Sequence, residues 1–278
     1  MPDRKLLLAA FVTALLVLGT SGTTRARWSD SATITGTGLH TGRLDLTVDG
    51  QDALTGYAAL DASTLVPGGS VAGVLTIGNA GSVPLDYAVS VTGTNADGKG
   101  LAAAVVTTVT DADTTTGATC GGAALGAATT LAAGGSDRIC VEVSLPSTAP
   151  ASLAGSASDL TVAVDSDVNH AWTDTAAVTG SSLATVALTA PTMSCGSLGV
   201  ASATLSWNAV PGATGYRIES SALLGGGVLD VSANTLSKTF TGVAGTATVR
   251  AIFGSATWLS PKSNSLTFSA LSGLGTCS

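Results

Sequence analysis

The residues able to support catalysis or metal binding are few, and they gather around one histidine. The chain of 278 residues has two histidines, two glutamates and sixteen aspartates. His170 lies close in sequence to Asp165, Asp167 and Asp174, so a carboxylate could orient its imidazole as a general base. Nucleophilic catalysis also needs an activated serine or cysteine, and the sequence has no Gly-x-Ser-x-Gly motif. We therefore interpret this stretch as a polar loop after a strand at Leu160–Val164.

The same stretch has the opening spacing of a calcium-binding loop. Asp165, Asp167 and Asn169 occupy the first, third and fifth positions of an EF-hand motif. The glycine that the motif requires next is His170, and its closing glutamate is Ala176. We therefore expect an Asx-rich turn. The alternative is a calcium site with these three residues as ligands. We predict no catalytic residue and no cofactor.

The first 26 residues have the organisation of a secretory signal peptide. Asp3-Arg4-Lys5 precede a largely apolar run, Leu6–Leu18, which is too short to span a bilayer comfortably. Small residues then predict cleavage between Ala26 and Arg27, with an uncleaved N-terminal anchor as the alternative. We expect a secreted protein, extracellular or associated with the cell surface, with no membrane contact after cleavage.

Secretion predicts that the four cysteines form disulfide bonds. Four cysteines allow three connectivities, and spacing favours Cys120–Cys140 and Cys195–Cys277 because each pair then lies within one predicted domain. Zinc is the competing interpretation, but the sequence has no Cys-x-x-Cys pair.

Composition excludes several classes of protein. Only 10% of residues are charged, the net charge is −7, and 35 residues are glycine. A basic nucleic-acid binder and a helical bundle do not fit this profile, so we expect no nucleic-acid partner. The scarcity of histidine and glutamate also disfavours most ordinary enzymes.

Short alternating strands separated by turns predict an all-β chain of two domains. We expect residues 27–187 to form a jelly-roll or β-sandwich domain and residues 188–278 a second β-sandwich. The stretch Leu101–Val109 has conflicting helix and strand signals. The first region has a net charge of −11 and the second +2, which permits a head-to-tail electrostatic contact between copies. In the first region the expected strands are Arg43–Val48, Val71–Ile77, Leu85–Val91, Ile139–Leu145 and Leu160–Val164. In the second region they are Ala203–Trp207, Gly215–Glu219, Lys238–Thr241, Thr246–Phe253 and Ser265–Phe268.

Four short motifs follow one another in the first region: Trp28-Ser-Asp30, Thr41-Gly-Arg-Leu-Asp-Leu46, Leu65-Val-Pro-Gly-Gly69 and Gly78-Asn-Ala-Gly-Ser-Val83. This succession resembles the TasA/camelysin family of proteins exported with a SipW-type signal. The resemblance is good to about Tyr87 and general to Gly180; Gly69 departs from the aspartate that the family often has there. It implies a structural or adhesive role in extracellular fibres of the biofilm-matrix kind.

The second region contains Leu205-Ser-Trp207, followed by Pro211-Gly212 and Tyr216. These residues resemble the second strand of a fibronectin type III module and the turn after it, and the resemblance extends over Thr192–Ala270, with Trp207 expected in the core. The tyrosine that the module has before Val249 is Gly245 here, so the tyrosine corner is absent.

From these resemblances we expect a non-enzymatic surface or matrix protein that associates with itself or with matrix components. The segment Arg27–Gly42 is Thr-rich and nearly uncharged, which suits addition to the open sheet edge of a neighbour. Trp28 and Ile34 are its candidate apolar anchors; in the alternative, the segment is the first strand of its own domain.

Two alternatives stay open. The first is enzymatic: a camelysin-like metallopeptidase or an accessory spacer module of a polysaccharide-acting system. Against the peptidase, the sequence has no His-Glu-x-x-His, and neither Glu142 nor Glu219 adjoins His40 or His170. The second is a ligand-binding module, with Trp172 and Trp258 as candidate contacts, although we favour packing roles for both.

Overall fold

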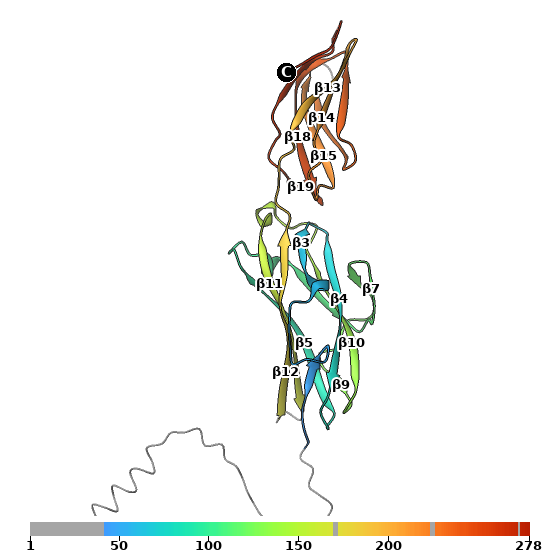
Figure 1. The fold of residues 1–278 in the computed structure, drawn as a ribbon, viewed down its shortest axis with the longest axis vertical. Helices are drawn as coiled ribbons and strands as arrows, with labels where there is room; N and C mark the ends of the chain where they lie inside the picture. Colours follow the sequence, from blue (N-terminus) through green and yellow to red (C-terminus); the bar gives the residue numbers. More distant parts are fainter. Residues whose placement is uncertain (1–41, 169–171, 223–225, 272) are drawn as a thin grey trace, which may run out of the picture. The chain divides into compact units, whose positions relative to one another are not determined.

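The computed structural model describes residues 42–168, 172–222, 226–271 and 273–278. These residues form an all-β fold, as predicted (Figure 1). Strands up to Thr185 pair with one another, and strands from Met193 onward do the same, so that no described strand of one group pairs with the other. The predicted signal peptide and the cleavage site at Ala26 and Arg27 lie outside the described residues.

The first group forms two main sheets and a small ribbon. The four-stranded sheet has the order β1 (Leu46–Val48), β4 (Ser70–Asn79), β10 (Ser136–Ser144) and β6 (Val106–Thr110). The six-stranded sheet runs β2 (Ala53–Thr55), β12 (Trp172–Thr185), β11 (Ala157–Val168), β5 (Leu85–Asn95) and β9 (Thr129–Leu131), with β3 (Ala62–Leu65) also on β12. The ribbon pairs β7 (Thr115–Thr116) with β8 (Thr119–Cys120).

Alternation along the strands explains the core between these sheets. In β4, Leu75 and Ile77 are buried while the residues between them are only partly covered, the period-2 pattern of a strand with one buried face. In β10, Ile139, Val141 and Val143 are buried as well, and the alternation is interrupted at Cys140, which is buried on the other face by its disulfide bond to Cys120. Burying alternate aliphatic side chains of two facing sheets is the main source of stability for such a sandwich.

The second group also forms two sheets. One has the order β13 (Met193–Gly199), β14 (Ser202–Trp207) and β17 (Ser237–Thr241). The other has the order β16 (Gly227–Ser232), β15 (Gly215–Ala222), β18 (Ala244–Phe253), β20 (Leu266–Ser269) and β21 (Thr276–Cys277), with β19 (Ser255–Leu259) also on β18.

Trp207 and Tyr216 lie in the core of the second group, as the fibronectin resemblance implies. Both are buried, and their ring centroids are 5.8 Å apart. The Tyr216 hydroxyl accepts the backbone N–H of Val210 at 2.8 Å, across the turn at Pro211-Gly212. This hydrogen bond joins Tyr216 to the backbone six residues upstream. It is formed by a different tyrosine from the one in the tyrosine corner, whose position is Gly245 here.

Both disulfide bonds favoured by spacing are present. Cys120 is bonded to Cys140 and Cys195 to Cys277, and no described cysteine is free. Two disulfides indicate an oxidising environment. Within the described ranges, the model contains no helix with the length and apolar character needed to cross a bilayer.

The stretch Leu101–Val109, whose helix and strand signals conflict, contains a helical turn and the start of a strand. Leu101–Ala104 forms a single helical turn, α2, and β6 begins two residues later. Leu101 is fully buried, so the turn pins one side chain into the core before the chain extends. Two short 3₁₀ turns complete the described elements: η1 (Ala58–Leu60) and η2 (Ala151–Leu153).

The predicted polar loop after Leu160–Val164 is wrong. β11 continues to Val168, and the chain returns as β12, the longest strand of the structure at 14 residues. The two form an antiparallel pair in which Val168 lies opposite Trp172.

Candidate functional site

Asp165 and Asp167, considered as the opening ligands of a calcium loop, lie in a strand. Both aspartates are in β11, where Asp165 lies opposite Thr175 and Asp167 opposite Thr173. Alternate residues of a strand share one face and stand roughly 6.6 Å apart along an extended backbone, which is not the conformation of an EF-hand loop. Asn169, His170 and His40 lie outside the described residues. Among the residues that the structure describes, no three His, Cys, Asp or Glu side chains are grouped to hold a metal ion.

Asp174 has a structural task that the sequence did not suggest. Its carboxylate accepts the backbone N–H of Leu46 at 2.8 Å and the backbone N–H of the next residue, Thr175, at 2.9 Å. The first bond joins β12 to β1, strands that belong to different sheets. Asp174 therefore bridges the two sheets of the sandwich.

The two tryptophans considered as ligand contacts differ in exposure. Trp258 is fully buried, and its indole N–H donates to the carbonyl of Ala149 at 2.8 Å, so it has the packing role that we favoured. Trp172 is 49% exposed at the start of β12. The strand-addition candidates Trp28 and Ile34 lie outside the described residues.

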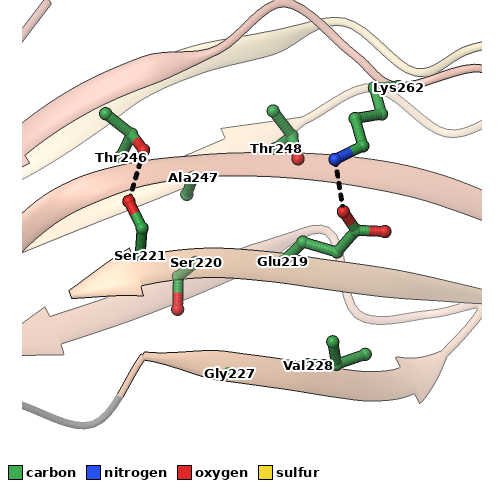
Figure 2. A pocket seen from close by; sticks show the side chains of 9 residues that line it. All are labelled: Glu219, Ser220, Ser221, Gly227, Val228, Thr246, Ala247, Thr248 and Lys262. Atoms are coloured by element: carbon green, nitrogen blue, oxygen red, sulfur yellow. Dashed lines mark hydrogen bonds and ion pairs between the residues drawn. The ribbon is translucent and has the colours of Figure 1, made fainter.

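A groove of about 360 Å³ crosses the outer face of β15, β16 and β18 (Figure 2). Glu219 and Lys262 point toward each other across it, with the Lys262 Nζ 2.6 Å from a carboxylate oxygen of Glu219. Farther along, the hydroxyls of Ser221 and Thr246 share a hydrogen bond of 2.7 Å. The groove is therefore lined by one ion pair and several hydroxyls.

The ion pair limits the chemistry that this groove can perform. The hydrogen bond from Lys262 lowers the pKa of the Glu219 carboxyl below its ordinary value. A carboxylate held ionised in this way is a weaker base. Glu219 is therefore poorly suited to activate Ser220 or Ser221 as a nucleophile, and the groove presents an ion pair and several hydroxyl groups.

A second groove, of about 340 Å³, lies between β3 and the start of β4. Its lining runs over residues 61–66 and 69–71. β3 pairs with β12 on one side only, and β1 pairs with β4 only at Ile77–Asn79. These two strands therefore border the groove with backbone that no described strand pairs.

The rest of the free edge of β4 is covered by other groups. Asp49 bonds both ways with Thr76: its N–H donates to the Thr76 carbonyl, and its carboxylate accepts the Thr76 N–H. The Tyr57 hydroxyl donates to the Val74 carbonyl at 2.6 Å, and the Tyr57 ring packs so close to Gly73 that a side chain there would collide with it. The part of the edge that no described strand pairs is therefore Ser70–Ala72, where the Ser70 hydroxyl donates to the Ala118 carbonyl at 2.7 Å.

A third groove, of about 530 Å³, lies at the ends of β5 and β11. It includes Asp86 and Asp167, which are direct partners across the two strands. Like charges placed opposite each other in a sheet repel. The Thr130 hydroxyl donates to Asp86 at 2.6 Å, which partly offsets this cost.

No protein-family model matches the chain, and no curated protein matches its sequence. Several solved structures resemble it distantly. A two-domain fibronectin type III segment of chicken tenascin has a TM-score of 0.27 and 12% identity, over 84% of this chain and 96% of that one. The chicken CNTN1 FN1–FN3 domains have a TM-score of 0.27 and 14% identity, over 80% of this chain and 62% of that one.

A Salmonella enterica complex of the SafA pilin with the SafB chaperone has a TM-score of 0.25 and 12% identity, over 84% of this chain and 98% of the matched chain. These matches are all to β-sandwich proteins, in keeping with the fold described above. At TM-scores of this size they carry no argument about function.

Proposed function

We propose that the chain is a secreted structural or adhesive protein of the cell surface or extracellular matrix, similar to TasA and camelysin, which assembles by strand addition. The observation that carries the proposal is the groove between β3 and β4. Each of its two borders is a strand edge that no described strand pairs. The sandwich is cross-linked by a disulfide, and Tyr57 and Asp49 cover the neighbouring part of the β4 edge.

An added strand supplies backbone N–H and C=O groups to strand edges that no described strand pairs. A segment added along an open edge forms main-chain hydrogen bonds, and its alternate side chains enter the space between the sheets. The segment Arg27–Gly42 suits this task because it is rich in threonine and nearly free of charge. In the proposal, Trp28 and Ile34 from one copy are the apolar anchors on the next.

Deleting Arg27–Gly38 from the mature protein tests the proposal, with assembly followed by light scattering. We expect assembly to be lost. Thr64→Lys should weaken it as well, because Thr64 is exposed and lines the groove. Thr175→Lys, exposed on β12 and not among the residues lining the groove, is the matched control. Assembly that survives the deletion unchanged would rule strand addition out.

The proposal also holds that the chain is not an enzyme. The pairing of Glu219 with Lys262 supports this for the groove of Figure 2. Incubation of the mature protein with casein, with and without a chelator, tests it. Chelator-sensitive cleavage that His40→Ala or His170→Ala abolishes would establish the peptidase alternative instead.

A further inference from the structure

The strand β16 ends its sheet with an apolar, unpaired edge. It pairs with β15 over Gly227–Ser232, and no described strand lies on its other side. Val228 is 65% exposed and Leu229 is 43% exposed. Successive strand residues point to opposite faces, so both faces of this edge carry an exposed aliphatic side chain.

Exposed strand edges invite pairing with another chain, and proteins usually protect them with charge, irregularity or a cover. The strand β6 is covered, because the N–H of Asp111 donates to Ala123 and the N–H of Leu125 donates to Val109. On β17, the edge carries Lys238.

Two further terminal strands are protected in other ways. A register shift between Cys195 and Leu198 interrupts β13, and the Asn264 side chain bonds to both the N–H and the carbonyl of Met193. On β19, Trp258 is buried and bonded to the carbonyl of Ala149. By contrast, β16 has no lysine, no proline and no register shift.

The charges beside the β16 edge are already paired within the chain. Asp230 receives two hydrogen bonds of 2.7 Å from the guanidinium of Arg217 on β15. Glu219 and Lys262 form the ion pair of the neighbouring groove (Figure 2). A second copy that approaches this edge therefore meets paired charges, and its own edge presents the same arrangement.

We propose that β16 pairs antiparallel with β16 of a second copy of this chain, joining two sheets into one across a two-fold axis. Such an interface is self-complementary, because each edge offers the same backbone donors and acceptors in reverse order. With the axis at Leu229, Val228 lies opposite Asp230 and Gly227 opposite Val231, so no two like charges are direct partners. The contact is independent of the proposed strand addition, which uses the other group of sheets.

Sedimentation velocity of the mature protein over a range of concentrations tests this pairing. We expect a concentration-dependent dimer, beside any larger assembly formed by strand addition, whose association constant Val228→Lys lowers by roughly tenfold or more, since a 1.4 kcal/mol penalty already has that effect. Val200→Lys is the matched control: Val200 is 83% exposed and belongs to neither β15 nor β16. A wild type that stays monomeric throughout, or a Val228→Lys variant that dimerises like the wild type, would overturn the proposal.

Two further variants distinguish the β16 pairing from strand addition and test the register of the pairing. A chain beginning at Gly42 should dimerise as the mature protein does; loss of the dimer would assign the association to the N-terminal segment and overturn the pairing. Leu229→Cys should cross-link two copies under mild oxidation, because residues directly opposite have Cβ atoms about 4.5–5.5 Å apart. Cross-linking that is no faster for Leu229→Cys than for Val200→Cys would contradict the proposed register.

Discussion

Asn79 is a buried polar residue that joins three parts of the first sandwich. It is 1% exposed, and its side-chain amide donates to the carbonyls of Val83, Leu131 and Ala132, while its side-chain oxygen accepts the Gly81 N–H. It begins the Asn-Ala-Gly-Ser motif on which the TasA/camelysin resemblance partly rests. The backbone at Arg43, just before β1, lies close against the same motif. A side chain at Gly81 would collide with the carbonyl oxygen of Arg43.

Replacing Asn79 with alanine should therefore lower the free energy of unfolding by about 2–3 kcal/mol, since the buried carbonyl of Leu131 and the partly buried carbonyls of Val83 and Ala132 would lose their donor. Denaturant unfolding of Asn79→Ala measures the loss. The control is Asn234→Ala, at an exposed turn position, for which a change within about 0.5 kcal/mol is expected. Equal losses in the two variants would show that the amide of Asn79 has no special role.

Acidification should weaken the second sandwich through two ion pairs. Lys262 lowers the pKa of Glu219, and Arg217 lowers the pKa of Asp230. A lowered pKa in the folded state contributes stability above the unfolded pKa, near pH 4 for both groups, which is lost as pH falls through the folded value. We expect Tm to fall as pH drops from about 5 to about 2, and to fall less in Glu219→Gln than in the wild type.

Thermal unfolding at a series of pH values checks this expectation. The exposed Asp159→Asn in β11 is the control for the loss of one negative charge. The slope of Tm against pH should be smaller in Glu219→Gln than in Asp159→Asn. Identical slopes for wild type and Glu219→Gln would contradict a contribution from this ion pair.

Among the elements, strands with regular aliphatic alternation could be predicted and β12 could not. Its buried residues are Ala176 and Val178, then Ser181, Leu183 and Thr185, so the buried positions change from even to odd along the strand. The change coincides with a register shift against β11, beside Gly180 at a φ of +74°. Such a bulge adds one residue and reverses the inward face. The period-2 pattern in the sequence breaks there, so β12 lacks the continuous alternation by which the other strands were predicted.

The two disulfides constrain loops of different length and should differ in their contribution to stability. Cys120–Cys140 closes a separation of 20 residues and Cys195–Cys277 one of 82. In the chain-entropy model, these loops correspond to about 3 and about 4.5 kcal/mol of stabilisation. Denaturant unfolding of the paired Cys→Ala variants should show the larger loss for the second pair. A larger loss for Cys120→Ala/Cys140→Ala would show that effects other than loop entropy dominate.

For the whole molecule, the sequence predicted the fold class and the disulfide pairs but not the grooves. Alternation and cysteine spacing are local signals. The groove between β3 and β4 depends instead on β1 being short enough to leave Ser70–Ala72 open, and on Tyr57 covering Gly73. The open edge of β16 likewise depends on which strand ends the sheet. Such features arise from the order of strands in space, which local patterns do not determine.

Salt dependence separates two modes of assembly for the mature protein. Residues 27–187 carry a net charge of −11 and residues 188–278 carry +2, so a head-to-tail contact between them would be electrostatic. Attraction between exposed charges weakens as salt shortens the screening length from about 30 Å at 0.01 M to about 3 Å at 1 M. Strand addition and edge pairing depend instead on main-chain hydrogen bonds and apolar burial, and screening also reduces repulsion between copies that are negative overall.

We therefore expect light scattering of the mature protein to stay constant or to rise between about 0.05 M and 1 M sodium chloride. The matched control is the variant lacking Arg27–Gly38, in which scattering should be low at both concentrations. Assembly that dissolves in high salt would assign the association to the opposite charges of the two regions, and the unpaired edges of β3, β4 and β16 would then have no part in it.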